Sequence, residues 1–246
     1  MNRFVDIHAN ILPNLHTVGQ KAPTMEQAVE RLMQAEASSI KTMIATPFYD
    51  PDEFSSVDDF FASRSEQIAA LNAFAVEKYH PVRILGGSVL RYTPDILQMG
   101  ESLRRFGLAD SRYMLLDLPD MNLTEEFFDN MKKCQLISGL TPILADFDRF
   151  YNTLTLEDFF AFHEAEMLVQ ISAQAILNPE TRRLSLYLLG NQNVHFVASG
   201  SLAPDVELNL ADAMRTTQRN LPADIYRRIK NNSGMLLSDA APSEFL

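Results

Sequence analysis

Short apolar runs alternate with longer amphipathic stretches along most of this chain, and this alternation restricts the folds that the chain can adopt. The longer stretches place apolar residues at helical spacing, and several begin with the Thr, Ser or Asn that favours a helix N-cap. A regular order of strand, helix and strand favours parallel pairing, with the helices covering the sheet. The chain is therefore predicted to have an α/β fold. The predicted strands are residues 4–7, 42–45, 82–85, 113–116, 142–145, 168–171 and 194–198.

The alternation alone leaves two architectures open. A closed barrel and an open, doubly wound sheet both satisfy it, because each consists of parallel strands joined by covering helices. A chain of 246 residues is long enough for either, and we expect one domain over residues 1–246. The last ~10 residues, ending in "SDAAPSEFL", are expected to form a loosely held tail. In both architectures, the side chains that bind ligands follow the carboxyl ends of the strands.

The net charge and the lack of long apolar segments exclude two classes of partner. With a formal net charge of -11, the chain does not suit nucleic acid, whose binding depends on clustered Lys and Arg. No segment approaches the roughly 18 consecutive apolar residues of a membrane span, and "MNRFVDIHAN" lacks the apolar core of a signal peptide. We therefore expect a cytoplasmic protein that is not transmembrane, and we leave its oligomeric state open. Cys134, the single cysteine, is predicted to be a buried, inert thiol.

The segments that follow the predicted strands form a characteristic series. "DIHANILP" begins at Asp6, and the later segments include "IATPFY", "ILADFDRF" and "VHFVASG". In order and spacing, from Asp6 to Pro204, they resemble the polymerase and histidinol phosphatase (PHP) superfamily. Within it, they resemble the manganese-dependent tyrosine-protein phosphatases of bacterial capsule and exopolysaccharide operons. This resemblance implies a PHP-type distorted (β/α)7 barrel, with its site at the carboxyl ends of the strands.

The same resemblance implies that most of the family's metal ligands are replaced in this chain. His8 is kept in the first loop, whereas Asn10 stands where the family has a second histidine. Asp117 is shorter than the family's glutamate, and Asp146 replaces a histidine. Arg149 matches an arginine that contacts phosphate in the family. The remaining ligand positions hold His16, Thr17, Phe48, Val89, Gly200 and Leu202.

A cluster of two or three divalent ions needs most of its carboxylate and imidazole ligands to balance charge and to form a hydroxide nucleophile. We therefore expect no cofactor and assign no catalytic residue. His8, Asp117 and Asp146 could hold at most one ion weakly, if they converge. The pocket is predicted to be less polar than its relatives', because Phe48, Val89 and Leu202 replace charged ligands. This vestigial pocket is predicted to contain His8, Asn10, Asp117, Asp146, Asp148 and Arg149.

Two functions are compatible with this sequence. The first is a catalytically inactive homologue that acts as a binding or regulatory protein in capsule or exopolysaccharide biosynthesis. By resemblance, its partner would be a phosphotyrosine segment of a protein or a homologous phosphatase. The second is a phosphoesterase of the protein-tyrosine phosphatase kind with a reduced site, which uses manganese or another divalent ion, or Arg149 with an aspartate base.

Several of these residues also have ordinary structural interpretations. His8 could be a hydrogen-bonded residue at a strand end, and the strand-end aspartates could cap helices or pair with Arg149. His195 lies in an apolar strand and is predicted to be structural. "SVDDFFASRSEQ" and "LTLEDFFAFHEAE" contain paired phenylalanines that could form a partner-binding stripe, although helical spacing favours the core face of a helix.

Overall fold

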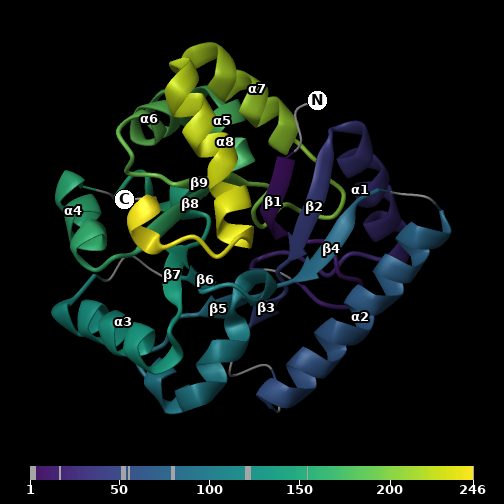
Figure 1. Cartoon of the computed structure of the whole chain (residues 1–246), viewed down its shortest axis with the longest axis horizontal. Helices are drawn as coiled ribbons and strands as arrows, with labels where there is room; N and C mark the ends of the chain where they lie inside the picture. Colours follow the sequence, from purple (N-terminus) through teal and green to yellow (C-terminus); the bar gives the residue numbers. More distant parts are fainter. Residues whose placement is uncertain are drawn as a thin grey trace.

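The strands of this protein form a curled parallel sheet surrounded by helices (Figure 1). The structure is a computed structural model, and it describes residues 4–16, 18–50, 54, 56–78, 81–119, 123–153 and 155–245. Every pairing between its strands is parallel, as the alternation predicts. The strands are β1 (Phe4–Ala9), β2 (Ile40–Ala45), β3 (Phe48–Tyr49), β4 (Arg83–Gly86), β5 (Val89–Arg91), β6 (Tyr113–Asp117), β7 (Thr141–Leu144), β8 (Leu168–Ser172) and β9 (Phe196–Ala198).

The strands β1 to β9 occupy seven positions around the barrel. Two of these positions are each filled by two consecutive strands with a short break between them. One sheet has the order β1-β2-β4, and the other has the order β3-β5-β6-β7-β8-β9. β3 follows β2 after a short break at Pro47, which has no N–H to donate, and β5 follows β4 after a break at Gly87 and Ser88. A bridge between Ala9 and Gly200 joins β1 to the segment after β9, and the Gly200 N–H donates to the His8 carbonyl at 2.9 Å. This closure confirms the predicted barrel-like fold and excludes the open, doubly wound sheet.

The helices begin where the sequence supplies capping side chains. The hydroxyl of Thr24 accepts a hydrogen bond from the backbone N–H of Gln27, and Thr124 and Thr155 cap the helices that follow them in the same way. The α-helices are α1 (Met25–Ala37), α2 (Val57–Glu77), α3 (Glu125–Ser138), α4 (Leu156–Glu164), α5 (Ala173–Leu177), α6 (Pro179–Gly190), α7 (Leu210–Asn220) and α8 (Ala223–Leu237). The 3-10 helices are η1 (Ile96–Phe106), η2 (Leu108–Asp110), η3 (Phe147–Phe150) and η4 (Pro242–Glu244).

Two apolar layers hold the fold together. The larger layer lies between the strands and the outer helices, and the smaller one fills the interior of the barrel. The inner layer includes Phe48 and Val89, which are 4% and 0% exposed. In the described residues, no helix combines the length and the apolar character that a membrane span requires.

Three local predictions differ from the structure. The segment expected to form an amphipathic α-helix after the third strand is instead the 3-10 helix η1, because Gly100 adopts φ 53° and ψ -131° and interrupts it. The elements predicted from the sequence end at Ala198, whereas the structure also has α7 and α8 after it. The predicted loose tail is also wrong, since the ring of Phe245 is 2% exposed and packs against Tyr113 and Phe196. Burial of this aromatic side chain outweighs the entropy that a free end would keep.

Candidate functional site

A buried hydrogen-bonded network lies at the carboxyl ends of β1, β7 and β8. The side-chain oxygen of Gln170 accepts from the Asp146 backbone N–H at 2.9 Å, and it lies 3.0 Å from His8 Nδ1. Because that oxygen is an acceptor, Nδ1 of His8 is the donor in this contact, and Nε2 is a buried atom with no partner among the described residues. The network therefore fixes the orientation of the His8 ring. It also explains the burial of His8, which is 0% exposed.

Asp146 is fixed from several directions. Its backbone is left-handed, with φ 45°, and its two oxygens accept from the Gln170 side-chain amide at 3.3 Å and the Ser201 backbone N–H at 2.8 Å. His8 Nδ1 lies 3.6 Å from Asp146 Oδ1. Burial alone would raise the pKa of Asp146, but His8 and these hydrogen bonds outweigh it and hold the pKa below the usual value. The carboxylate is therefore ionised and already hydrogen bonded within the chain.

A second group of charges lies beside this network at the ends of β5 and β6. Arg149 donates to Asp117 Oδ1 at 2.6 Å, and it is positioned by a further hydrogen bond from its Nε to the Asp146 carbonyl at 3.2 Å. Arg91 pairs with Asp50 at 3.0 Å, and its Nε lies 3.9 Å from Asp117 Oδ2. The guanidinium of Arg91 also lies over the Phe48 ring, 5.1 Å from its centroid. The buried Asp117 is thus neutralised by arginines.

The other two predicted pocket residues have structural contacts. Asp148 accepts from the backbone N–H and the hydroxyl of Ser172 at 2.7 and 2.8 Å, which fixes the start of α5. Burial and the neighbouring charge of Asp146 raise the pKa of Asp148, and the hydrogen bonds from Ser172 only partly offset them. The Asn10 side-chain amide donates to the Leu202 carbonyl at 3.2 Å, so it ties the first loop to the last.

A cavity of about 600 Å³ opens beside these residues, and we call it the strand-end cavity. Asp146, Asp148 and Arg149 line it, whereas His8, Asn10 and Asp117 do not belong to its lining. One wall is apolar and is formed by Val18, Leu202, Ala203 and Val206. The remaining lining residues are Gly19, Gln20, Ser172, Gln174, Ser199 and Ser201. The cavity therefore offers an apolar wall next to hydrogen-bonding groups and one guanidinium.

The residues that replace the family's metal ligands lie in three different environments. Leu202 lines the strand-end cavity, as predicted. Phe48 and Val89 lie in the inner apolar layer rather than in the cavity lining. Gly200 closes the barrel against β1. Thr17 lies outside the described residues.

Two residues that organise this site were missed by the sequence analysis. Gln170 connects His8 to Asp146, and its only signal is a polar side chain inside the apolar run "LVQIS". Arg31 of α1 is 1% exposed and donates to the carbonyls of Leu202 and Ala203. Its signal is a charged residue on the buried face of an amphipathic helix, at helical spacing from Ala28 and Ala35.

His195 supplies a pH dependence of stability. Burial, reinforced by the charges of Arg228 and His163, lowers the pKa of His195 to about 3, and its Nδ1 accepts from the Val169 N–H at 3.1 Å. In the unfolded chain the pKa is about 6.5, so the unfolded state binds the proton first and stability falls as the pH drops from about 6.5 towards 3. We expect a loss of about 1.4 kcal/mol from this group between about pH 7.5 and about pH 5.5.

Urea unfolding at both pH values measures this loss. The His195→Asn variant, whose side-chain oxygen can replace Nδ1 as acceptor, should lack that part of the pH dependence. Equal losses in the two proteins would show that His195 does not stay neutral in the folded state.

Comparison with known proteins gives a consistent family assignment. Residues 4–237 match the family described as "Capsular polysaccharide synthesis, CpsB/CapC". The chain is 25% identical over 203 residues to CapC of Staphylococcus aureus, which is named as a tyrosine-protein phosphatase; the match covers 80% of this chain and 76% of CapC. It also matches the solved YwqE of Bacillus subtilis and CpsB of Streptococcus pneumoniae, described as metal-dependent tyrosine phosphatases. That match has a TM-score of 0.82 and 21% identity, and covers 96% of this chain and 95% of the other.

A more distant match supports the fold alone. The histidinol phosphate phosphatase of Lactococcus lactis, solved with zinc, L-histidinol and phosphate, gives a TM-score of 0.50 at 13% identity. The match covers 89% of this chain and 95% of that one.

The expectation of no cofactor is wrong, because YwqE and CpsB are described as metal-dependent. The buried, unpartnered Nε2 of His8 is suited to ligation, but Asp146 and Asp117 are engaged as described above. Across the residues that the structure describes, no three His, Cys, Asp or Glu side chains converge as a metal site. These residues therefore do not fit the multinuclear centre that the resemblance implies.

Proposed function

Because this chain belongs to the CpsB/CapC family of capsular polysaccharide synthesis, we propose that it is a phosphatase homologue that binds a tyrosine-phosphorylated protein segment without hydrolysing it. The observation that supports this proposal is the state of the strand-end carboxylates. The oxygens of Asp146 and Asp148 accept hydrogen bonds from Ser201, Gln170 and Ser172. A carboxylate engaged in this way is poorly placed to activate a water molecule, since catalysis requires a base within reach of the attacking group.

The strand-end cavity suits such a segment. Its apolar wall, which includes Val18, Leu202 and Val206, offers a surface for an aromatic ring. The side chain of Arg149 is 37% exposed and faces the same cavity, so it can donate to a phosphoryl group at the end of that ring. Binding would support a regulatory role in capsule synthesis, either on the phosphorylated protein or on a homologous phosphatase that competes for it.

Turnover is the first test of this proposal. The purified chain is assayed with p-nitrophenyl phosphate and with a phosphotyrosyl peptide, once with EDTA and once with added manganese, next to CpsB as the active reference. We expect no hydrolysis above the blank under either condition. Manganese-dependent hydrolysis at a rate comparable to that of CpsB would contradict the proposal.

Binding is the second test, and it uses fluorescence anisotropy of the labelled phosphotyrosyl peptide. Arg149→Gln removes the charge-assisted donor and should weaken binding about tenfold. Leu202→Trp fills the cavity and should have a similar effect without touching the Asp117 pair. Arg219→Gln, an exposed arginine on α7, is the matched control and should bind like the parent protein. Equal binding by all four proteins would place the peptide elsewhere.

One observation favours a phosphoesterase with a reduced site as a second candidate. Asp148 lines the strand-end cavity and has a raised pKa, a combination that suits proton transfer during hydrolysis beside Arg149. If the turnover assay detects hydrolysis, then His8→Ala, Asp117→Ala, Asp146→Ala and Asp148→Asn should each reduce it. Hydrolysis that is indifferent to these four changes would assign the activity to a contaminant or to another site.

A further inference from the structure

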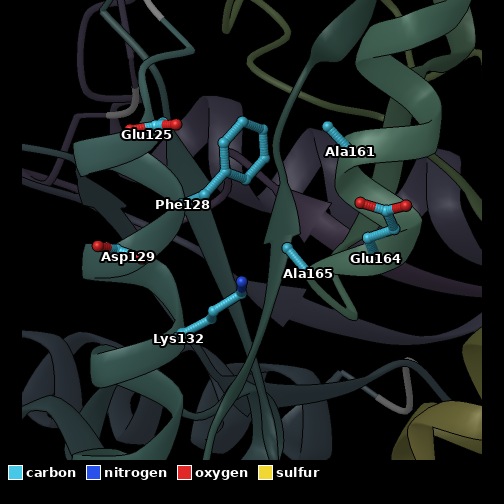
Figure 2. A pocket seen from close by; sticks show the side chains of 7 residues that line it. All are labelled: Glu125, Phe128, Asp129, Lys132, Ala161, Glu164 and Ala165. Carbon is cyan, nitrogen blue, oxygen red and sulfur yellow. The ribbon is translucent and has the colours of Figure 1, made fainter.

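A second cavity lies on the outer surface, between α3 and α4, away from the strand-end cavity. Its volume is about 450 Å³, and we call it the α3–α4 groove (Figure 2). Small side chains leave room for the groove, because its lining on this side includes Ala161 of α4 and Ala165 just beyond its last residue. The amide of Gln135 donates to the Ala165 carbonyl at 2.9 Å, so the spacing of the two segments is fixed there.

The floor of the groove is aromatic. Figure 2 shows the ring of Phe128 extending from α3 into the space between the two helices. The Phe128 and Phe162 rings pack with their centroids 6.2 Å apart, and this contact helps to hold the Phe128 ring in place. A partly exposed ring held in this way presents an electron-rich face that attracts cations.

The walls of the groove are acidic. Glu125 and Asp129 extend from α3, Glu164 extends from α4, and Lys132 is the one basic residue in the lining. Within the described part of the chain, none of these four charged side chains forms a hydrogen bond or an ion pair. The three carboxylates are therefore available to a ligand, and they outnumber the single ammonium group.

Two exposed apolar side chains lie on the same two helices, each one helical turn from a charged residue of the lining. Leu136, which is 84% exposed, lies one helical turn beyond Lys132, and Phe160, which is 70% exposed, lies one turn before Glu164. The paired phenylalanines of α4 thus divide their roles: Phe159 is 6% exposed and belongs to the core, whereas Phe160 points to solvent. The interpretation of this pair as a core face holds only for Phe159.

We propose that the α3–α4 groove binds an arginine-containing segment of a partner protein in which the arginine has apolar neighbours. The guanidinium lies against the Phe128 ring and donates to carboxylates on both walls, while the apolar neighbours pack on Leu136 and Phe160. Arginine suits the site better than lysine, because its planar group stacks on a ring and still donates in its own plane to carboxylates on either side. The three carboxylates favour a basic segment over an acidic or phosphorylated one, because the negative charge of the groove would repel the latter.

A labelled peptide tests this proposal directly. The probe is fluorescein-labelled Gly-Leu-Arg-Leu-Arg-Leu-Gly amide, and its binding to the full chain is followed by fluorescence anisotropy. Glu164→Lys reverses one wall and Ala161→Leu fills the groove, and each should weaken binding about tenfold. Glu66→Lys, which makes the same charge change at an exposed position of α2, is the matched control and should leave binding within about twofold of the parent.

Several outcomes would overturn the proposal. One is no binding of the probe by the parent protein, and another is equal weakening by Glu66→Lys, which would show a general effect of net charge. A third is equal binding of the same peptide with citrulline in place of arginine, because citrulline keeps the shape and loses the charge. A fourth is self-association by sedimentation that Glu164→Lys abolishes and the peptide does not reverse, since the occupant would then be a second copy of the chain.

Discussion

Replacing Gly200 with alanine should destabilise the protein by about 3 kcal/mol, because two separate costs add at this position. Gly200 has φ +74°, a backbone conformation that disfavours side chains. A Cβ there would also lie 2.3 Å from Asp146 Oδ1 and 3.1 Å from the Ser172 Cβ. The Asp146 carboxylate cannot move away without breaking its hydrogen bond from Ser201. Gly200→Asp, which introduces a larger side chain at the same place, should cost at least as much.

Denaturant unfolding measures this effect, and the chain supplies a matched control. Gly139 has φ +71°, but a Cβ there would meet no atom within 4 Å. Gly139→Ala should therefore cost only about 1 kcal/mol, from the backbone alone. In a double-mutant cycle, Asp146→Ala should recover part of the cost of Gly200→Ala because it removes the clashing oxygen. Equal costs for the two glycines, or perfect additivity in the cycle, would show that a Cβ at position 200 does not clash with the Asp146 carboxylate.

Replacing Arg31 with methionine should destabilise the protein by a similar amount, about 3 kcal/mol. The guanidinium is buried and donates to the carbonyls of Leu202 and Ala203, and the Val206 carbonyl lies 3.5 Å away. Burial lowers the pKa of Arg31, and the nearby Asp6 and Asp205 only partly offset it. Methionine fills much of the volume but leaves these carbonyls without their donor.

The same change should loosen one wall of the strand-end cavity. Leu202, Ala203 and Val206 all line it, so we expect faster hydrogen exchange at residues 201–206 and weaker binding of the phosphotyrosyl peptide. The control is Arg215→Met on α7, where the arginine is 57% exposed and pairs with Asp212 at 2.6 Å; it should cost at most about 0.5 kcal/mol. If the two arginine variants are equally stable, Arg31 does not anchor this loop.

The sequence predicted the local structure well wherever a periodic pattern was long. Apolar runs bounded by polar residues located all seven strand positions, and Thr24, Thr124 and Thr155 begin helices as capping residues do. These features depend on hydrogen bonds between residues near one another in the chain, so a single sequence contains the information. The pattern failed at Gly100, where one backbone conformation ends a segment that is otherwise amphipathic.

The C-terminal tail shows a second limit on what local sequence patterns can predict. Its composition is that of a flexible end, yet Phe245 packs against Tyr113 and Phe196. Tyr113 and Phe196 lie 132 and 49 positions earlier in the chain, and no local sequence pattern predicts contacts over such separations. A segment rich in small and polar residues becomes ordered when one of its large side chains fills a cavity of matching shape in the core.

The sequence by itself determined the alternation of strands and helices, the edge of the sheet at which the site lies, and the family to which its motifs correspond. Only the tertiary structure decided which residues share that site. Gln170 joins His8 to Asp146, Gly200 leaves room for the Asp146 carboxylate, and Phe48 lies in the inner layer rather than in the cavity. These contacts arise when the barrel closes and sets the register of strands far apart in the chain, and a distance set by closure cannot be read from local periodicity.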